Sequence, residues 1–329
     1  MKYSFVIPVF NRPDEVAELL DSLVRQTYKD FEVIVVEDGS QVPCQDVVEP
    51  FADRLDVRYF VKPNSGPGQS RNYGVERASG EYVLILDSDV VLPDGYLEAV
   101  ERELSLSPCD AFGGPDCAHP SFTPVQKAIN YAMTSFFTTG GIRGGKRKLD
   151  RFFPRSFNMG VQRDVYTRLG GFSKMRFGED IDFSYRIVGT GLSSRLFPEA
   201  WVWHKRRTNF RKFFKQVHNS GIARIHLTRR HPGTLKIVHL LPAAFTLGCA
   251  LLIIGSFFCL WSLLPLLLFA LLVATDATIR NRSLHIGLLA VVASFIQLWG
   301  YGTGFLRAWW ACYVLGKPEF NAFNKTFYK

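Results

Sequence analysis

The chain has 329 residues, a formal net charge of +9 and 47% hydrophobic residues, so it is long enough for one large domain or two. Its six cysteines lack the C-x-x-C spacing of a zinc site and do not suggest a disulfide framework. No nucleic-acid-binding motif accompanies the positive charge, so we expect membrane lipids, and no nucleic acid, as partners of the basic residues.

The first 90 residues alternate between apolar runs and helical patterns. We predict helices over residues 14–26 and 68–78, and strands over residues 3–9, 31–36, 57–61 and 81–86. Alternating β and α units imply a doubly wound, mostly parallel sheet, and ligands bind beyond the carboxyl ends of such strands. The apolar run at residues 3–9 is too short for a signal peptide, so we expect this domain to stay in the cytosol.

Two aspartates separated by one residue follow the predicted strand at residues 81–86. In extended chain Asp87 and Asp89 share a face, so both carboxylates can point at one divalent cation. Mg²⁺ and Mn²⁺ prefer oxygen ligands. Taken alone, the motif is equally explained by a solvated turn at the end of a strand. Because neither a G-x-G-x-x-G motif nor a P-loop occurs, phosphate must be bound through a metal and basic side chains.

The last third of the chain is strongly apolar, and basic residues flank its apolar runs. We predict membrane spans at about 237–255, 258–275 and 284–306. The positive-inside rule places the basic clusters before the first span and after the second in the cytoplasm. Three spans would translocate three C-terminal lysines, so a re-entrant or surface-lying final segment is an alternative. A buried helical hairpin in a soluble protein is another.

An amphipathic segment precedes the first predicted span. Within residues 209–218 the apolar side chains recur at helical spacing, and basic residues occupy the other face. The apolar residues are Phe210, Phe213, Phe214 and Val217. This pattern is typical of a helix that lies among lipid headgroups. A helix packed on the core of the domain would show the same pattern.

Five pieces of the sequence, in this order, resemble the family 2 glycosyltransferases, which have the GT-A fold. They lie at residues 6–12, 36–40, 64–74, 80–89 and 170–180, and the resemblance covers about residues 3–205. It implies an inverting, metal-dependent enzyme whose donor is a UDP- or GDP-sugar. The implied cofactor is a divalent cation, Mg²⁺ or Mn²⁺.

The resemblance assigns roles to residues on the donor side. Asp38 would accept a hydrogen bond from the base, and Arg71 would contact base or diphosphate, since a guanidinium suits phosphate geometry. Asp87 would face the ribose and the metal, and Asp89 would bind the metal, which neutralises the departing diphosphate. The other residues expected to bind the nucleotide sugar are Pro8, Phe10, Asn11, Arg12, Asn64, Gly66 and Ser88.

The resemblance also names a third metal ligand and a catalytic base. His204 would complete the metal site, although it could equally belong to a basic surface with the residues that follow it. Asp180 would be the general base that deprotonates the acceptor hydroxyl. Glu179 and Asp182 are plausible in the same role, and a solvated helix start is the simpler reading of the acidic pair alone.

Acceptor contacts are expected in the region where the pattern loosens. Residues 140–148 form a glycine-rich, basic stretch that includes Arg143, and it could bind a lipid diphosphate or close over the donor. A flexible solvated loop has the same composition. Asn158 and Glu179 are further expected acceptor contacts.

We therefore expect a multi-pass protein of the cell (inner) membrane with a cytoplasmic catalytic domain. It would transfer sugar to a lipid-linked or glycolipid acceptor, as in cell envelope polysaccharide synthesis. The expected domains are a GT-A domain at 1–207, an interfacial segment at 208–236 and a membrane domain at 237–329. A processive polysaccharide synthase is an alternative, but the Q-x-x-R-W motif that such enzymes carry before their spans does not occur here. A non-catalytic scaffold is another, against which the full set of carboxylates argues.

Overall fold

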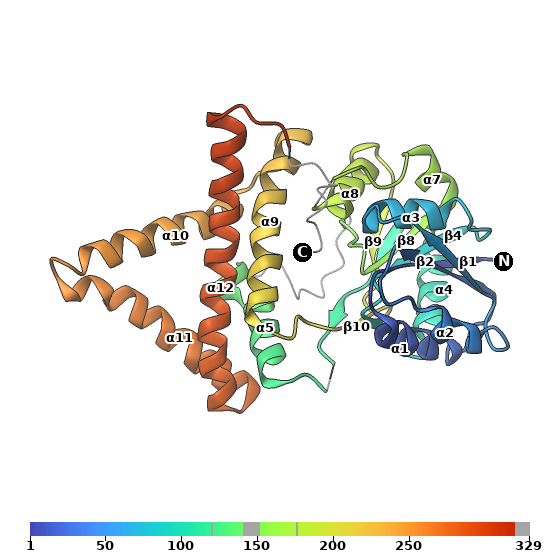
Figure 1. Ribbon diagram of the computed structural model, residues 1–329, viewed down its shortest axis with the longest axis horizontal. Coiled ribbons are helices and arrows are strands. Elements are labelled where there is room, and N and C mark those ends of the chain that lie inside the picture. The colour runs from blue at the N-terminus through green and yellow to red at the C-terminus, as the bar shows by residue number, and fades with distance from the viewer. Residues whose placement is uncertain (120, 141–151, 176, 320–329) are drawn as a thin grey trace. The chain divides into compact units, whose positions relative to one another are not determined.

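The computed structural model describes residues 1–119, 121–140, 152–175 and 177–319 (Figure 1). They form two compact units, each with its own apolar core. The N-terminal unit contains residues 1–117 and 152–205, and the helical unit contains residues 118–140 and 206–319.

The N-terminal unit is built on a seven-stranded sheet with the order β3-β2-β1-β4-β8-β6-β9. Four strands are parallel neighbours: β1 (Tyr3–Val9), β2 (Phe31–Asp38), β3 (Val57–Lys62) and β4 (Tyr82–Leu86). The antiparallel strand β8 (Asn158–Gln162) separates β4 from the parallel pair β6 (Ala111–Gly113) and β9 (Ser194–Leu196). The prediction of a doubly wound, mostly parallel sheet is confirmed. Asp38 is the last residue of β2, which extends beyond the predicted end.

Helices cover both faces of this sheet because alternate strand residues point to opposite sides. Phe5 and Ile7 of β1 pack under α1 (Pro13–Val24), α2 (Gln45–Val48), the 3₁₀ turn Glu49–Phe51 and α4 (Tyr96–Leu106). Val6 packs on the other face with α3 (Pro67–Val75), α7 (Arg163–Arg168) and α8 (Glu179–Gly189). The loops that follow the carboxyl ends of β1, β2 and β4 carry the candidate site.

A second, three-stranded sheet has the order β5-β10-β7. It consists of β5 (Val90–Val91), β7 (Asp116–Cys117) and β10 (Val202–His204), and β10 pairs His204 with Val90. The backbone N–H of Lys205 also donates to the Asp89 carbonyl, 3.0 Å away. This small sheet therefore fastens the end of β10 beside the loop that follows β4.

The helical unit contains α5 (Pro124–Thr134), α6 (Phe136–Thr139), α9 (Phe210–Arg230), α10 (Ile237–Gly255), α11 (Leu264–Asn281) and α12 (Leu284–Trp309). A 3₁₀ turn, Leu260–Leu263, precedes α11, and a π-helical turn, Trp310–Val314, follows α12. Three segments are long and apolar enough to cross a membrane: Ile237–Gly255, Leu260–Asn281 and Leu284–Val314.

Two features of the helical unit bear on the sequence-based expectations. Helix α5 lies inside the stretch predicted to belong to the GT-A domain, but it packs with α9, α11 and α12. Helix α9 is 21 residues long, and its Phe213 and Val217 are buried in the same cluster as Ala290 and Ala293 of α12. The apolar stripe of α9 therefore meets protein, because α12 supplies a long-range partner that the local pattern does not reveal.

Candidate active site

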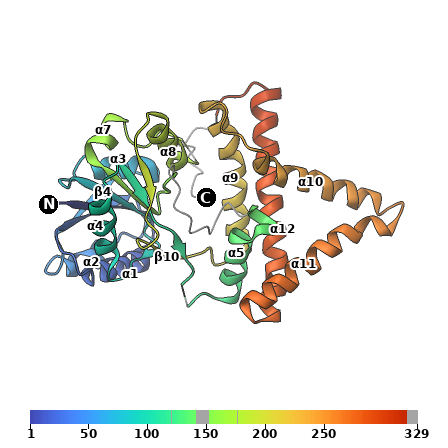
Figure 2. The same cartoon turned by 180° about the vertical axis from the view of Figure 1, so that it is seen from behind.

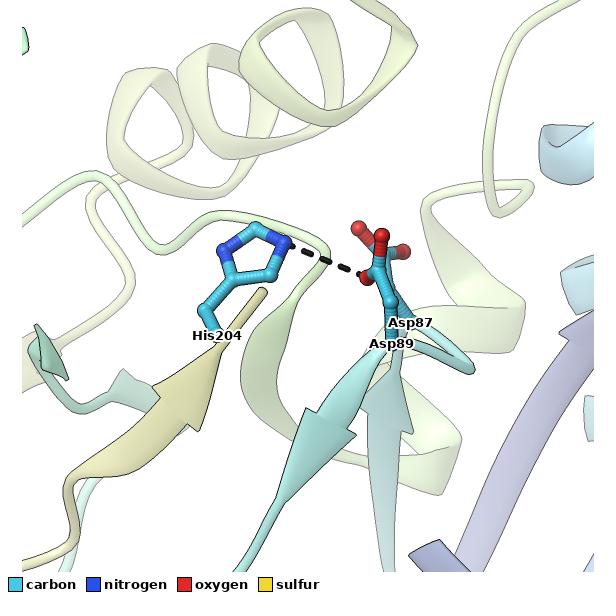
Figure 3. Close-up of side chains that lie close together, drawn as sticks. All are labelled: Asp87, Asp89 and His204. Carbon is cyan, nitrogen blue, oxygen red and sulfur yellow. Dashed lines mark ion pairs between the residues drawn. The ribbon is translucent and has the colours of Figure 1, made fainter. Parts of the chain in front are cut away.

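Asp87, Asp89 and His204 form one cluster, named here the Asp–Asp–His cluster, at the carboxyl end of β4. One ligand atom from each residue lies within 4.8 Å of the others. Figure 3 shows the two carboxylates facing the imidazole, whose Nε2 is 3.2 Å from Asp89 Oδ1. The His204 ring stacks on Phe157 with the ring centroids 5.0 Å apart, which fixes its orientation.

The cluster suits a divalent cation by its chemistry as well as its spacing. Two carboxylates and one imidazole are oxygen and nitrogen ligands of the kind Mn²⁺ accepts, and carboxylates also suit Mg²⁺. The side chains of Asp89 and His204 are 8% and 17% exposed, whereas that of Asp87 is 31% exposed. Asp89 is thus the buried ligand of the site, and Asp87 is the one most open to solvent.

An arginine also contacts the cluster. Arg12 Nη1 lies 2.6 Å from Asp89 Oδ2, so the guanidinium and the imidazole contact different oxygens of the same carboxylate. Burial works against the charge of Arg12, but the adjacent Asp89 carboxylate outweighs it and raises the arginine pKa. A cation that binds Asp89 must therefore compete with Arg12 or share the carboxylate with it.

Arg71 links the cluster to the acidic pair at the start of α8. Its buried guanidinium donates from Nη2 to Asp87 Oδ1 at 2.7 Å and from Nη1 to Glu179 Oε1 at 2.8 Å. Its carbon Cζ lies 5.2 Å from the centre of the Phe172 ring. Arg71 thus bridges two carboxylates that are 92 positions apart along the chain. Its contact with base or diphosphate, which the resemblance implies, stays a prediction.

Asp38, at the end of β2, contacts Asn64 and Gly66 in the loop that follows β3. The Asp38 carboxylate accepts hydrogen bonds from the backbone N–H groups of Ser65 and Gly66, each at 2.8 Å, and from Lys62 Nζ at 2.6 Å. Asn64 Nδ2 donates to the Asp38 carbonyl at 2.8 Å. Asp38 therefore organises the turn that precedes α3, and its role in binding the base stays a prediction.

The loop after β1 is tied to the loop after β2 by Asn11. Its side-chain Oδ1 accepts from the backbone N–H groups of Gln41 and Val42 at 2.8 and 3.0 Å. Asn11 has a φ of 53°, a left-handed conformation that asparagine tolerates better than most residues. Pro8, near the end of β1, and Phe10, on the loop that follows, are half-buried. Ser88 is buried between the two aspartates of the cluster.

The acidic pair Glu179 and Asp180 occupies the first turn of α8, after Gly178 with a φ of 82°. Asp180 Oδ2 accepts from Arg155 Nε at 2.7 Å. Burial disfavours the charge on Asp180, but the Arg155 guanidinium outweighs the effect of burial and lowers the pKa of this carboxyl. For Glu179 the effect of burial prevails and raises the pKa, because the Arg71 guanidinium offsets it only partly. Asp182, the other candidate base, is buried and paired with Arg186 at 3.0 Å.

Arg155 is the site residue that the sequence reasoning missed. It lies 25 positions from its partner and belongs to no motif, so no local signal distinguishes it from the other arginines. The backbone N–H of Asn158 donates to the Arg155 carbonyl at 2.9 Å, which helps to hold the arginine at the start of β8.

Of the expected acceptor residues, Asn158 is buried in the N-terminal unit. The Asn158 side chain is 1% exposed, donates to the Ala200 carbonyl at 2.8 Å and accepts from the Tyr96 hydroxyl at 2.6 Å. These contacts use the amide in packing, so we do not retain Asn158 as an acceptor contact. Arg143 lies outside the described residues.

The family model described as glycosyl transferase family 2 matches residues 4–170. An uncharacterized glycosyltransferase of Rickettsia felis is 31% identical over 137 residues, which are 42% of this chain and 22% of that protein. The chain spans less than a third of the length of this and the other Rickettsia relatives.

Two solved structures share the fold. The mannosyltransferase PcManGT from Pyrobaculum calidifontis, in complex with GDP-Man and Mn²⁺, superposes with a TM-score of 0.64 at 18% identity, covering 91% of this chain and 87% of that one. S. aureus TarS 1-349 in complex with UDP-GlcNAc has a TM-score of 0.51 at 17% identity, covering 96% and 93%.

Proposed function

The chain belongs to glycosyl transferase family 2, and we propose that it is an inverting enzyme that transfers sugar from a UDP- or GDP-sugar to a lipid-linked or glycolipid acceptor. The observation that carries this proposal is the convergence of the Asp–Asp–His cluster with Arg71, Glu179 and Asp180 at the carboxyl end of β4. The fold relatives are named for complexes with GDP-Man and with UDP-GlcNAc, which supports a nucleotide-sugar donor.

On the donor side, the loops after β1 and β2 would bind the base and ribose. Asn11 holds these loops together, and Asp38 sets the turn that brings Asn64 and Gly66 to the same place. Asp87, Asp89 and His204 would hold a Mg²⁺ or Mn²⁺ ion, which when bound supplies Lewis-acid stabilisation of the departing diphosphate.

On the acceptor side, Asp180 would take the proton of the attacking hydroxyl. A carboxylate with a lowered pKa is ionised at neutral pH, so it is ready to accept a proton before the acceptor arrives. Arg155 would orient the carboxylate through its 2.7 Å hydrogen bond and stabilise its charge. Attack from the side opposite the leaving diphosphate gives inversion at the anomeric carbon.

We also propose that the helical unit keeps this reaction at the cytoplasmic face of the cell membrane. Three segments qualify as spans by length and composition, and basic residues flank them, including Lys236 before α10 and Arg282 after α11. An acceptor with a hydrophobic tail would be concentrated in the same layer as the enzyme.

The test is sugar transfer by membranes that contain the full chain. Incubation with a panel of radiolabelled nucleotide sugars and Mn²⁺ should label the lipid fraction with one donor. Asp89→Asn should abolish the label, whereas Asp94→Asn, at an exposed carboxylate that pairs with Arg25, should not. Unchanged turnover in a correctly folded Asp89→Asn protein would refute the proposed role of the cluster.

A further inference from the structure

Helices α9 and α12 lie against each other along most of α9, with their backbones in close contact. A Cβ added at Gly221 of α9 would lie 2.1 Å from the Tyr301 carbonyl oxygen. A Cβ added at Gly304 of α12 would lie 2.0 Å from the His218 carbonyl oxygen. Glycines at such contacts let helix backbones approach closely. Because the two helices are in contact over most of α9, both must lie at the same depth in a membrane along that contact.

Helix α9 cannot lie within the hydrocarbon layer. It has no acidic residue, and it exposes basic side chains at both ends. These exposed residues are Arg211, Lys212, Lys215, Arg229 and Arg230. Arg224 and Asn219 lie between the two ends. Charged side chains are costly at the centre of a bilayer, whereas they are favourable beside anionic headgroups. Helix α9 therefore belongs at the membrane surface.

Helix α12 contacts the end of α11 and the start of α10 near its own two ends. A Cβ added at Gly287 would lie 2.0 Å from Thr278 Oγ1, and one added at Gly302 would lie 2.4 Å from the Pro242 carbonyl oxygen. The N-terminal end of α12 follows directly from Arg280 and Arg282, at the end of α11. Beyond its C-terminal end, Glu319 pairs with Arg230 at 2.7 Å, and six residues separate Arg230 from the start of α10. Both ends of α12 are therefore beside the open end of the α10–α11 hairpin. A helix whose two ends lie on one face of a membrane does not cross it.

The aromatic residues of α12 support the same arrangement. Trp299 lies near the middle of the helix and is exposed, and Trp309, Trp310 and Tyr313 are exposed near its end. Tryptophan and tyrosine favour the level of the headgroups. A transverse α12 would put Trp299 at the bilayer centre, whereas an in-plane α12 puts all four residues at the preferred level.

From these contacts we propose that only α10 and α11 cross the bilayer and that α12 lies in the plane of the membrane, covered on its cytoplasmic side by α9 and α5. The basic face of α9 then binds the anionic headgroups of the cytoplasmic leaflet. This inference rests on the membrane placement in the proposed function, and it replaces the third predicted span with the surface-lying alternative.

The arrangement explains why α12 is apolar yet does not span. Its buried face meets α5 and α9 instead of water, and its exposed stripe of Leu284, Leu288 and Val292 meets lipid. The hairpin projects from α12 in both views (Figure 1 and Figure 2). Its tip, which carries no charge, exposes Phe257 and Trp261 by 84% and 77%. Aromatic residues there suit the opposite membrane surface.

Topology is tested with two reporters fused after Lys329 of the full chain, one that fluoresces in the cytoplasm and alkaline phosphatase, which is active outside it. We expect fluorescence and no phosphatase activity. Phosphatase activity without fluorescence would overturn the inference while leaving sugar transfer untouched. Loss of the protein from carbonate-washed membranes would instead refute the membrane placement that both proposals share.

The contact between the end of α9 and the segment that follows α12 is tested by cross-linking. Arg230→Cys with Glu319→Cys should form a disulfide when membranes are treated with a mild oxidant. Arg230→Cys with Leu284→Cys should not, because Leu284 lies at the other end of α12. A cross-link only in the second pair would overturn the arrangement, as would the absence of a link in the first pair in a protein that still transfers sugar.

The lipid contact is tested by the melting temperature of the detergent-solubilised full chain. Phosphatidylglycerol should raise it more than phosphatidylcholine, and Lys212→Gln with Lys215→Gln should reduce that difference by at least half. Lys29→Gln, in the N-terminal unit, is the matched control and should retain it. An equal effect of both lipids on the unaltered protein would overturn the assignment of anionic headgroups.

Discussion

Replacing Arg12 with glutamine should make the Asp–Asp–His cluster bind Mn²⁺ more tightly in the absence of nucleotide. Arg12 Nη1 contacts Asp89 Oδ2 at 2.6 Å, so the arginine competes with a cation for this carboxylate. The substitution leaves a shorter, polar side chain and removes the guanidinium with its charge. It removes the competitor without removing any of the three ligands.

The size of the effect follows from the contact that must be broken. A hydrogen bond to a charged group contributes about 1.5–3 kcal/mol. Because the Arg12 side chain is 32% exposed, water weakens the ion pair and the lower end of that range applies. About 1.4 kcal/mol corresponds to a tenfold change in a dissociation constant. We therefore expect about a tenfold tighter Mn²⁺ complex.

The assay is calorimetric titration of Mn²⁺ into the solubilised full chain without donor. Arg25→Gln is the control, since Arg25 forms ion pairs with Asp21 and Asp94 on the surface and should not alter the affinity. Weaker or unchanged Mn²⁺ binding by Arg12→Gln would refute the reasoning, because it would mean that Arg12 helps the cation or does not contact its ligand in solution.

Three further changes probe the base, the core and the buried charge of the N-terminal unit. Asp180→Asn should lower the rate of sugar transfer by about 10²–10⁴-fold, the usual contribution of a general base, while donor affinity by titration stays within about twofold. Gly160→Ala would place a Cβ 2.1 Å from the Phe112 ring. Chemical denaturation should show a free energy of unfolding lower by about 1–3 kcal/mol. Burial opposes the charge of Glu32, but hydrogen bonds that include those from Ser4 and Ser79 lower its pKa below 4.5. Its stabilising contribution is therefore complete above pH 4.5 and is lost as the pH falls through the lowered pKa. Glu32→Gln should be less stable at pH 7, and the difference from the parent in thermal melts should shrink in acid; a constant difference would contradict this account.

The parts of the fold that the sequence predicted are those with a local signal. The buried strands that precede Asp38 and Asp87 read as apolar runs bounded by polar residues, and parallel pairing brings their ends to one edge. The proposed metal ligands Asp87 and Asp89 are two residues apart, so their convergence needs no knowledge of tertiary structure.

The parts that the sequence did not predict depend on partners far along the chain. Strand β5 has two residues, which is too short for a periodic pattern, yet it fixes His204 beside the cluster. Arg155 and Arg71 act through carboxylates that no spacing rule connects to them. The apolar stripe of α9 has the same sequence pattern whether it contacts lipid or α12. The close packing of α12 on α9 depends on glycines of α12 more than 80 residues later in the chain.

The position of α5 in the chain has a consequence for how the protein is made. Tyr131 of α5 donates a hydrogen bond to Asp276 of α11, which is synthesised 145 residues later. At a synthesis rate of about 5–20 residues per second, α5 leaves the ribosome roughly 7–30 s before this partner exists. During that interval Ala128 and Ile129 have none of the C-terminal cover that they have in the finished fold. A polypeptide that stops at residue 205 would lack the helices that bury the apolar side chains of α5. Removing α5 as well should therefore give an N-terminal unit without this exposed apolar surface.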